Sequence, residues 1–426
     1  MMEQQKPINY TGPFLTMVFL FFIVGFLTVV NAQFQDPLKN ALLKGAGDLQ
    51  NTLATVITFA WFLSYPLTGG IAARLVNKFG YKKTMVRGLL VMIAGLAVFE
   101  CSVLFQEYNG ATITIGSAEL PIAYFIFIIG SYVVGAAVTI MQVVINPYLV
   151  ACNVKGTSDV QRQNIGGSSN SIASTLAPFL VGGVIFAGIA PADITLNKLI
   201  IPFLGLIVVI GIVTFIVNRI ALPNIAGTTN EGNVKLERSI WSFRHLTLGV
   251  VAIFMYVGVE VAVGANIVMN AKELGGTFAE NAAIMASLYF LGMLIGRLVG
   301  ASLSKVDAKI QLTVTAIAAA ILVTVAMFTN DLWLLVGIGL FHSVMWPATF
   351  ALAVRGLGKY TSAGSGALMI GVLGGGVLPL IQSAMADSMG GDWQWTWAIV
   401  LVGELYMLYY ALIGCKVAKS DDMTKQ

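Results

Sequence analysis

The chain has 426 residues, of which 57% are hydrophobic and only 10% are charged, and its formal net charge is +4. A soluble domain has about a quarter of its residues charged, so this composition excludes an ordinary soluble protein. The sequence has no GxxxxGKS nucleotide motif, and its three cysteines lie far apart. We therefore expect neither an ATP-driven pump nor an enzyme, and no metal centre, disulfide or cofactor.

Twelve apolar runs follow one another along the chain, and each is long enough to cross a bilayer, which takes about 20 apolar residues. The sequence predicts an all-α membrane protein with spans near residues 14–35, 51–73, 84–105, 121–150, 167–190, 199–222, 246–270, 282–303, 310–328, 332–354, 363–386 and 393–415. The first run follows MEQQKPINYTG without a cleavage site, so we expect it to remain as the first span.

The longest polar stretch between spans divides them six and six. It predicts an N-terminal half over 1–217, a linker over 218–245 and a C-terminal half over 246–426. The loops after spans 2 and 8 repeat a pair of lysines, Lys78 and Lys82 then Lys305 and Lys309, at an offset of 227. This arrangement resembles the major facilitator superfamily fold, in which the substrate lies between two six-helix halves at mid-membrane. The alternative is that both loops merely follow the membrane charge rule.

The basic residues are distributed unevenly between the two sides of the predicted membrane protein. The side with both termini collects 20 of the 24 Lys and Arg residues, leaving Lys39, Lys44, Lys198 and Lys272 for the other side. By the positive-inside rule both termini are expected in the cytoplasm. The basic patches therefore indicate orientation in a lipid bilayer rather than binding to nucleic acid.

Two acidic residues interrupt apolar helices, where a charge is costly and suggests a function. Asp36 follows the first run, with Asn31 and Gln33 before it, and Glu260 lies inside span 7. Their offset of 224 is close to that of the repeated loops, so we expect both to face one central cavity. For Asp36 the alternative is a solvated loop residue beyond the first span, which the adjacent Pro37 favours.

Two further acids are expected to be structural. Glu404 is predicted to occupy a peripheral position on span 12, and Asp387 to lie at the end of span 11. Neither is included in the predicted site.

Uncharged polar side chains are frequent inside the predicted spans. Amides both donate and accept hydrogen bonds, and aromatic faces cover the apolar side of a sugar ring, so this set favours a neutral polyol as ligand. The candidates are Asn31, Gln33, Gln142, Asn146, Asn164, Asn170, Asn266, His342 and Trp346. The same amides could simply join helices by hydrogen bonds, and His342 is either a pH-responsive relay or a packing residue.

Several strings together resemble the fucose permease and glucose/galactose transporter family of cation-coupled sugar symporters. They are INPYLV, RQN…SSNS, YVGVEVAVG, LIGRLVG and WPATFALAVRGLGKYTSAGSG…VLGGGVLPL. The resemblance implies a monomeric secondary transporter of the bacterial inner membrane. It would import a hexose or deoxyhexose, such as glucose, galactose, mannose or fucose, by proton symport and alternating access.

The resemblance also implies residue roles. The proton-accepting Asp of the family maps onto Asp36, with Glu260 as its partner, and a binding Asn maps onto Asn170. Gln142 stands where fucose permeases have a Glu, and Arg74 stands where an acid is common in the superfamily. Because a carboxylate among amides also suits a hard cation, Na⁺ remains an alternative to H⁺. A drug exporter or a nutrient sensor of the same fold is the alternative from another functional class.

Overall fold

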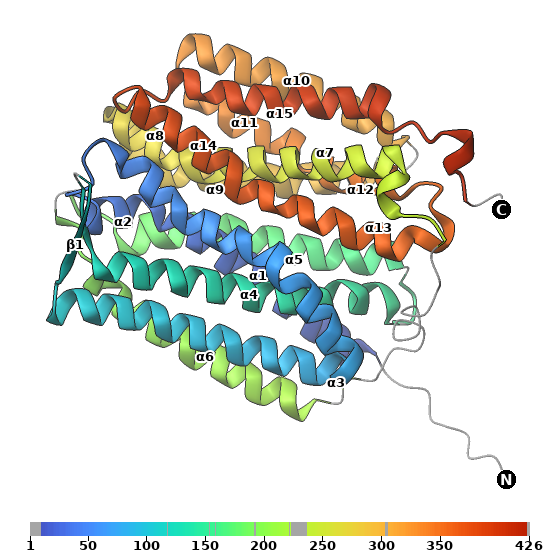
Figure 1. Ribbon diagram of the computed structural model, residues 1–426, viewed down its shortest axis with the longest axis horizontal. Coiled ribbons are helices and arrows are strands. Elements are labelled where there is room, and N and C mark those ends of the chain that lie inside the picture. The colour runs from blue at the N-terminus through green and yellow to red at the C-terminus, as the bar shows by residue number, and fades with distance from the viewer. Residues whose placement is uncertain are drawn as a thin grey trace.

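The computed structural model describes residues 10–116, 118–152, 154–157, 159–190, 193–220, 222, 237–302 and 306–423. They form a bundle of long helices that run along one common direction (Figure 1). A short antiparallel hairpin, β1 (Thr112–Ile115) and β2 (Ala118–Pro121), lies at one end of the bundle, hereafter the hairpin end. Helix α1 begins at the opposite end, hereafter the terminal end, where the last described turn (Lys419–Asp421) also lies.

Among the described residues of the first half, six α-helices follow one another. They are α1 (Thr11–Gln33), α2 (Gln35–Leu42), α3 (Gln50–Tyr108), α4 (Ile122–Ala151), α5 (Asp159–Leu180) and α6 (Ile200–Arg219). Helix α3 has 59 residues, about three times the number that a bilayer core requires. Gly80 interrupts it with φ 75° and ψ 174°, a conformation that glycine adopts without steric cost. Helix α3 is therefore two spans joined at Gly80.

Nine α-helices lie in the described part of the second half, and several of them are parts of one span. They are α7 (Arg244–Val261), α8 (Ile267–Leu274), α9 (Gly276–Ser302), α10 (Ala308–Thr329), α11 (Leu332–His342), α12 (Met345–Val354), α13 (Thr361–Leu368), α14 (Gly374–Ser388) and α15 (Ala398–Tyr409). A π-helical turn, Ala262–Asn266, joins α7 to α8, and a 3-10 turn, Met369–Leu373, joins α13 to α14. Helices α11 and α12 meet at an angle of 41°.

The described helices account for the twelve predicted spans. Ten helical segments are long and apolar enough to cross a membrane, and the bent pair α11–α12 makes eleven. The segment Gly47–Tyr108 is counted once among these but contains the two spans on either side of Gly80. The predicted fold class is confirmed. The predicted linker 218–245 falls largely on residues outside the described ranges, so the division of the chain there stays a prediction.

The first span is longer than predicted. Phe34 is a one-residue break between α1 and α2, and the helix then continues to Leu42. Pro37 lies in the first turn of α2, where its missing N–H leaves no helical hydrogen bond unmade. Asp36 is only 8% exposed. The alternative interpretation of Asp36 as a solvated loop residue is therefore wrong.

Small residues let helices of the two halves approach closely. A Cβ on Gly374 of α14 would lie 1.8 Å from the carbonyl oxygen of Phe254 in α7. On the same turn of α14, Cβ atoms on Gly375 and Gly376 would lie within 3.0 Å of Phe62 and Phe59 in α3. Since lipid removes the hydrophobic drive for helix association, such close packing is a main source of stability in membranes. Helix α14 thus bridges α7 of its own half and α3 of the other half.

Candidate functional site

A small polar cavity lies where α5 of the first half meets α7 and α9 of the second half. Its volume is about 20 Å³, and it is lined by Asn170, Ser171, Ser174, Glu260, Phe290, Met293 and Arg297. The cavity brings together two of the predicted site residues, Asn170 and Glu260. It also places a carboxylate and a guanidinium around one space between the halves.

Arg297 is a site residue that sequence reasoning missed. Its Nη1 atom donates to the carbonyl oxygen of Gly167 at 3.2 Å and to the hydroxyl of Ser171, so α9 is tied to α5 across the halves. We counted Arg297 among the basic residues that set orientation. The signal that would have found it is its position inside the apolar run MLIGRLVG, where a charge calls for a partner.

Asn170 lies at the contact between α5 and α1. Its side-chain nitrogen donates to the carbonyl oxygen of Phe21 at 3.1 Å. Gly25 allows this contact, because a Cβ there would lie 2.6 Å from that nitrogen and 2.6 Å from the main-chain oxygen of Asn170. The orientation of Asn170 at the cavity therefore depends on how closely α1 approaches.

Asp36 is buried at a different place from Glu260. The side-chain nitrogen of Asn40 donates to its Oδ1 at 3.2 Å, and the charges of Lys39 and Lys272 lie near it. Asp36 is not among the residues that line the cavity at Glu260. In this conformation the structure does not bring the two acids together in one cavity.

Four groups of contacts join the halves toward the hairpin end, and we name them the hairpin-end clasp. The Nε2 atom of Gln33 donates to the carbonyl oxygen of Gly264 at 2.9 Å, and Lys39 forms an ion pair with Glu273. The Asp387 carboxylate accepts from the backbone N–H groups of Asn51 at 3.1 Å and Thr52 at 2.6 Å. The hydroxyls of Thr55 and Ser383 are 2.6 Å apart. Asp387 does lie at a helix end, as predicted. Its carboxylate, however, caps the start of α3 in the other half.

The clasp and Arg297 together close the interface between the halves. Ligand sites for small molecules usually have volumes of about 300–1,000 Å³, whereas the cavity at Glu260 has about 20 Å³. A cavity of that size holds about one water molecule. At this cavity the structure is therefore closed to a larger ligand, which enters it only after the halves separate on one side.

Three predicted amides join neighbouring helices instead of lining this cavity. The Nε2 atom of Gln142 donates to the hydroxyl of Tyr65 at 2.9 Å, Asn146 Oδ1 accepts from Gln163 at 3.3 Å, and the side-chain nitrogen of Asn266 donates to Gln382 Oε1 at 2.9 Å. These contacts match the interpretation of amides as links between helices. Asn164 lies in α5, but its side chain is outside the described residues.

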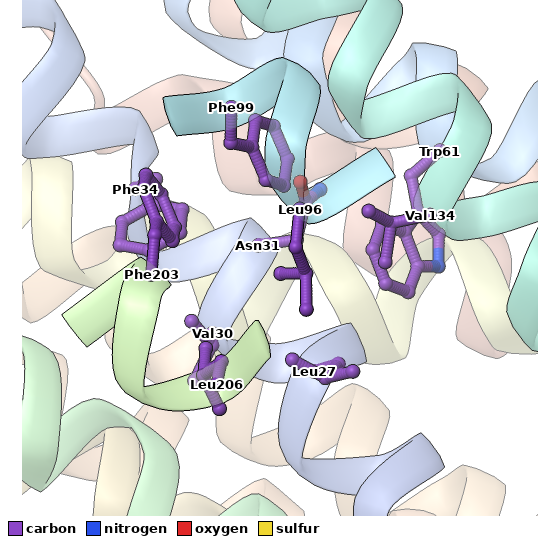
Figure 2. A pocket seen from close by; sticks show the side chains of 10 residues that line it. All are labelled: Leu27, Val30, Asn31, Phe34, Trp61, Leu96, Phe99, Val134, Phe203 and Leu206. Carbon is purple, nitrogen blue, oxygen red and sulfur yellow. The ribbon is translucent and has the colours of Figure 1, made fainter. Parts of the chain in front are cut away.

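Asn31 faces a second cavity, inside the first half. Figure 2 shows this cavity, of about 10 Å³, with Asn31 among aromatic and aliphatic side chains of α1, α3, α4 and α6. Asn31 is 2% exposed, and its oxygen accepts from the hydroxyl of Ser131 at 3.0 Å. In this conformation Asn31 is directed away from the cavity at Glu260.

His342 is part of a buried polar chain in the second half. Its Nδ1 atom lies 2.6 Å from the hydroxyl of Tyr289, and its Nε2 atom lies 2.6 Å from Oε1 of Glu404. Both His342 and Glu404 are fully buried, so the predicted peripheral position of Glu404 is wrong: α15 turns this side chain inward onto α11. The ring of Trp346 lies 6.3 Å from that of Tyr256, beside this chain.

The comparisons with known proteins agree with this fold. No family model matches the chain. The glucose/galactose transporter of Brucella abortus biovar 1 (strain 9-941) is 31% identical to it over 424 residues, which cover 97% of this chain and 97% of that protein. The chain belongs to the glucose/galactose transporter family.

More distant relatives agree with this fold. The L-fucose-proton symporter of Escherichia coli (strain K12) is 23% identical over 412 residues, covering 90% of this chain and 88% of that protein. A crystal structure of the major facilitator superfamily transporter FucP in the outward conformation covers 94% of this chain and 98% of its own, with a TM-score of 0.68 and 20% identity. The predicted family resemblance is confirmed.

Proposed function

We propose that the protein imports a monosaccharide together with protons by alternating access. The observation that carries this proposal is the cavity between the halves, lined by Glu260, Arg297 and Asn170. A carboxylate accepts hydrogen bonds, a guanidinium donates them and an amide does both, so together they match the hydroxyl groups of a sugar. Membership of a family whose members are named for glucose and galactose supports this ligand class.

Asp36 is the group that takes up and releases the coupling proton in this proposal. Its support is a carboxylate that is 8% exposed within the first span, next to the clasp that joins the halves. A buried carboxylate is easier to hold in the neutral form, so loading it with a proton is linked to closure of the clasp. Glu260 acts with it from the cavity.

The amides outside the cavity act by holding their helices. Gln33 belongs to the clasp, whereas Gln142, Asn146 and Asn266 set the packing of the helices around the site. When the halves separate, these side chains and Trp346 border the space that opens. The transporter works as a monomer in the bacterial inner membrane.

Both termini lie in the cytoplasm in this proposal. The support is the concentration of basic residues on their side of the bilayer. A cysteine placed at Asn109, at the hairpin end of α3, is expected to react with an impermeant reagent added outside intact cells. Labelling of this cysteine from the cytoplasm alone contradicts the orientation.

Uptake into vesicles tests the proposed function. The purified protein is reconstituted, and labelled D-glucose, D-galactose, D-mannose and L-fucose are offered under a proton gradient or a sodium gradient. We expect at least one of these sugars to accumulate when the proton gradient is imposed. Accumulation under the sodium gradient alone would identify Na⁺ instead of H⁺ as the coupling ion. If none of the four sugars accumulates under either gradient, a monosaccharide is rejected as the ligand.

A further inference from the structure

The second half contains a chain of titratable groups to which the proposed transport cycle assigns no role. It runs from Glu404 on α15 to His342 on α11 and then to Tyr289 on α9, with 2.6 Å at each of the two contacts. The Tyr289 hydroxyl also lies 3.2 Å from the carbonyl oxygen of Glu260 on α7. This row of hydrogen-bonded side chains therefore ends on the backbone of Glu260, a residue that lines the cavity.

The surroundings of this chain favour an uncharged pair. His342, Glu404 and Tyr289 are fully buried, and the ring of Tyr256 on α7 meets the imidazole edge to face at a centroid distance of 6.1 Å. The charges of Glu260 on α7 and Arg297 on α9 also act on Tyr289. Within the described part of the chain, Glu404 Oε2 has no hydrogen-bond partner. A bare oxygen on an ionised, buried carboxylate is costly.

The number of protons on His342 and Glu404 determines the net charge of this buried pair. An ionised Glu404 beside a neutral His342 gives a net buried charge of −1. One added proton makes the pair neutral, either as imidazolium with carboxylate or as imidazole with carboxylic acid. A low-dielectric interior favours the neutral pair, so the site retains one shared proton.

The shared proton also fixes the direction of the hydrogen bonds. Among the described residues Glu404 Oε2 has no acceptor for a hydrogen, so the shared proton lies on the bond between Oε1 and His342 Nε2. When it is present there, His342 Nδ1 carries a hydrogen that it donates to the Tyr289 oxygen, which leaves the Tyr289 hydroxyl free to donate to the Glu260 carbonyl. When it is absent, Nε2–H donates to Glu404 and the bare Nδ1 accepts from Tyr289. The hydroxyl has one hydrogen, so its bond to Glu260 is then lost.

We propose that His342 and Glu404 form a second proton-binding site, whose shared proton acts through Tyr289 to position the backbone of Glu260 at the cavity. Glu260 lies two residues before the π-helical turn Ala262–Asn266, where the regular hydrogen-bond ladder of α7 is interrupted. π-helical turns are frequent at functional sites. Loss of the Tyr289 bond at this point changes the direction of the Glu260 side chain. This role deepens the proposed function and rests on it, whereas the proton site itself does not depend on any sugar.

Nitrogen-15 NMR of the imidazole groups tests the proton site directly. The chain has two histidines, so the full-length protein in nanodiscs gives two sets of imidazole signals, and His342→Gln removes one of them. Tyr289→Phe, which alters only the His342 set, provides the assignment if His342→Gln does not fold. We expect Nδ1 of His342 to carry a hydrogen within the range from pH 5 to 9. A bare Nδ1 at every pH from 5 to 9 overturns the proposal.

Two matched tyrosine variants test the positioning role. Tyr289→Phe removes the hydroxyl at Glu260, and Tyr410→Phe removes an equally buried hydroxyl that donates to the carbonyl oxygen of His245 at 3.1 Å on the same helix, α7. In exchange of labelled D-galactose across vesicles between pH 5 and 9, we expect Tyr289→Phe to flatten the pH profile and to lower exchange at its optimum about fivefold. Tyr410→Phe is expected to keep the wild-type profile. Equal profiles for both variants exclude the positioning role, whereas a wild type that exchanges no sugar rejects the proposed function and leaves the NMR result standing.

Discussion

At the scale of single residues, Arg297 combines two tasks, since it borders the cavity and ties α9 to α5 through Gly167 and Ser171. A lysine keeps the positive charge but loses the planar set of donors that makes several directed contacts at once. We expect Arg297→Lys to weaken sugar binding about tenfold, which corresponds to about 1.4 kcal/mol. Binding is measured by calorimetry on the purified protein.

The control for this variant is Arg355→Lys. Arg355 is half exposed and pairs with Asp307 at 3.4 Å, and an exposed ion pair contributes little. Its sugar affinity is expected to equal that of the wild type. Equal affinities for both lysine variants contradict the role of Arg297 in the site.

Asp36 is the residue that the proposal makes responsible for coupling. Asp36→Asn keeps the size and hydrogen bonding of the side chain but removes its titration, so the carrier behaves as if permanently protonated. Exchange of labelled for unlabelled sugar is expected to persist, because it needs only the loaded carrier, whereas accumulation against a gradient is lost. Vesicle uptake with and without internal sugar separates the two activities.

Asp48→Asn serves as the control for coupling, because Asp48 is exposed at the hairpin end. It is expected to accumulate sugar as the wild type does. If Asp36→Asn accumulates sugar normally, Asp36 is not the coupling residue. Accumulation by Glu260→Gln then tests whether Glu260 has that role.

Sequence could identify some of these residues and not others for a physical reason. Asp36 and Glu260 are predictable because Asp36 directly follows a long apolar run and Glu260 lies inside one. Arg297 lies near the end of a span, where a basic residue also fits the positive-inside pattern. The contact of His342 with Glu404 joins residues 62 positions apart on two helices, and their distance depends on helix rotation, which hydrophobicity alone does not define in a chain that is apolar on nearly every face.

At the scale of helices, hydropathy located the spans but not their internal breaks. The break at Phe34, the π-helical turn Ala262–Asn266 and the bend between α11 and α12 all lie inside apolar runs. Hydropathy reports whether a segment is stable in lipid, and these local changes of backbone leave the composition unchanged. Gly80 was predicted only as part of a loop, because a single left-handed residue between two helices has no hydropathy signal.

The contact between α1 and α5 yields a prediction at this scale. Gly25→Ala places a Cβ 2.6 Å from the main chain of Asn170, so the helices must move apart. Overpacking of this kind costs about 1–3 kcal/mol, and we expect a lower melting temperature together with weaker sugar binding. Thermal unfolding followed by intrinsic fluorescence measures the first effect.

Gly69→Ala is the matched control, because a Cβ at this helical glycine of α3 meets no atom within 4 Å. Alanine is favoured over glycine in a helix by up to about 1 kcal/mol, so this variant is expected to be as stable as the wild type or more so. A Gly25→Ala variant with unchanged melting would show that α1 and α5 do not need this close approach.

At the scale of the whole molecule, the clasp determines which side of the closed structure can open. The Asp387 carboxylate accepts three hydrogen bonds at the start of α3, two from backbone N–H groups and one from the Thr52 hydroxyl. Hydrogen bonds to a charged group each contribute about 1.5–3 kcal/mol. We therefore expect Asp387→Ala to increase the population open at the hairpin end at least about tenfold.

Spin labels at Tyr108 and Met389, exposed residues near the ends of α3 and α14, measure this opening as a longer distance. Asp392→Ala is the control, since Asp392 accepts from the backbone N–H of Gln394 within its own half. Its distance distribution is expected to match the wild type. An unchanged distribution in Asp387→Ala rules out the clasp as the element that holds this end closed.

The small size of the cavity at Glu260 has a consequence for the membrane as an insulator. A file of water molecules through a carrier would conduct protons without sugar and discharge the gradient that the cell maintains. The closed structure leaves room for about one water at this cavity, too little for such a file to pass there. In the proposed transport cycle, a proton crosses this level bound to a side chain while the halves change which side is open. Tight packing between the halves therefore prevents an uncoupled proton current through the transporter at this level. A variant that enlarges the cavity is expected to conduct protons without sugar before it loses sugar transport.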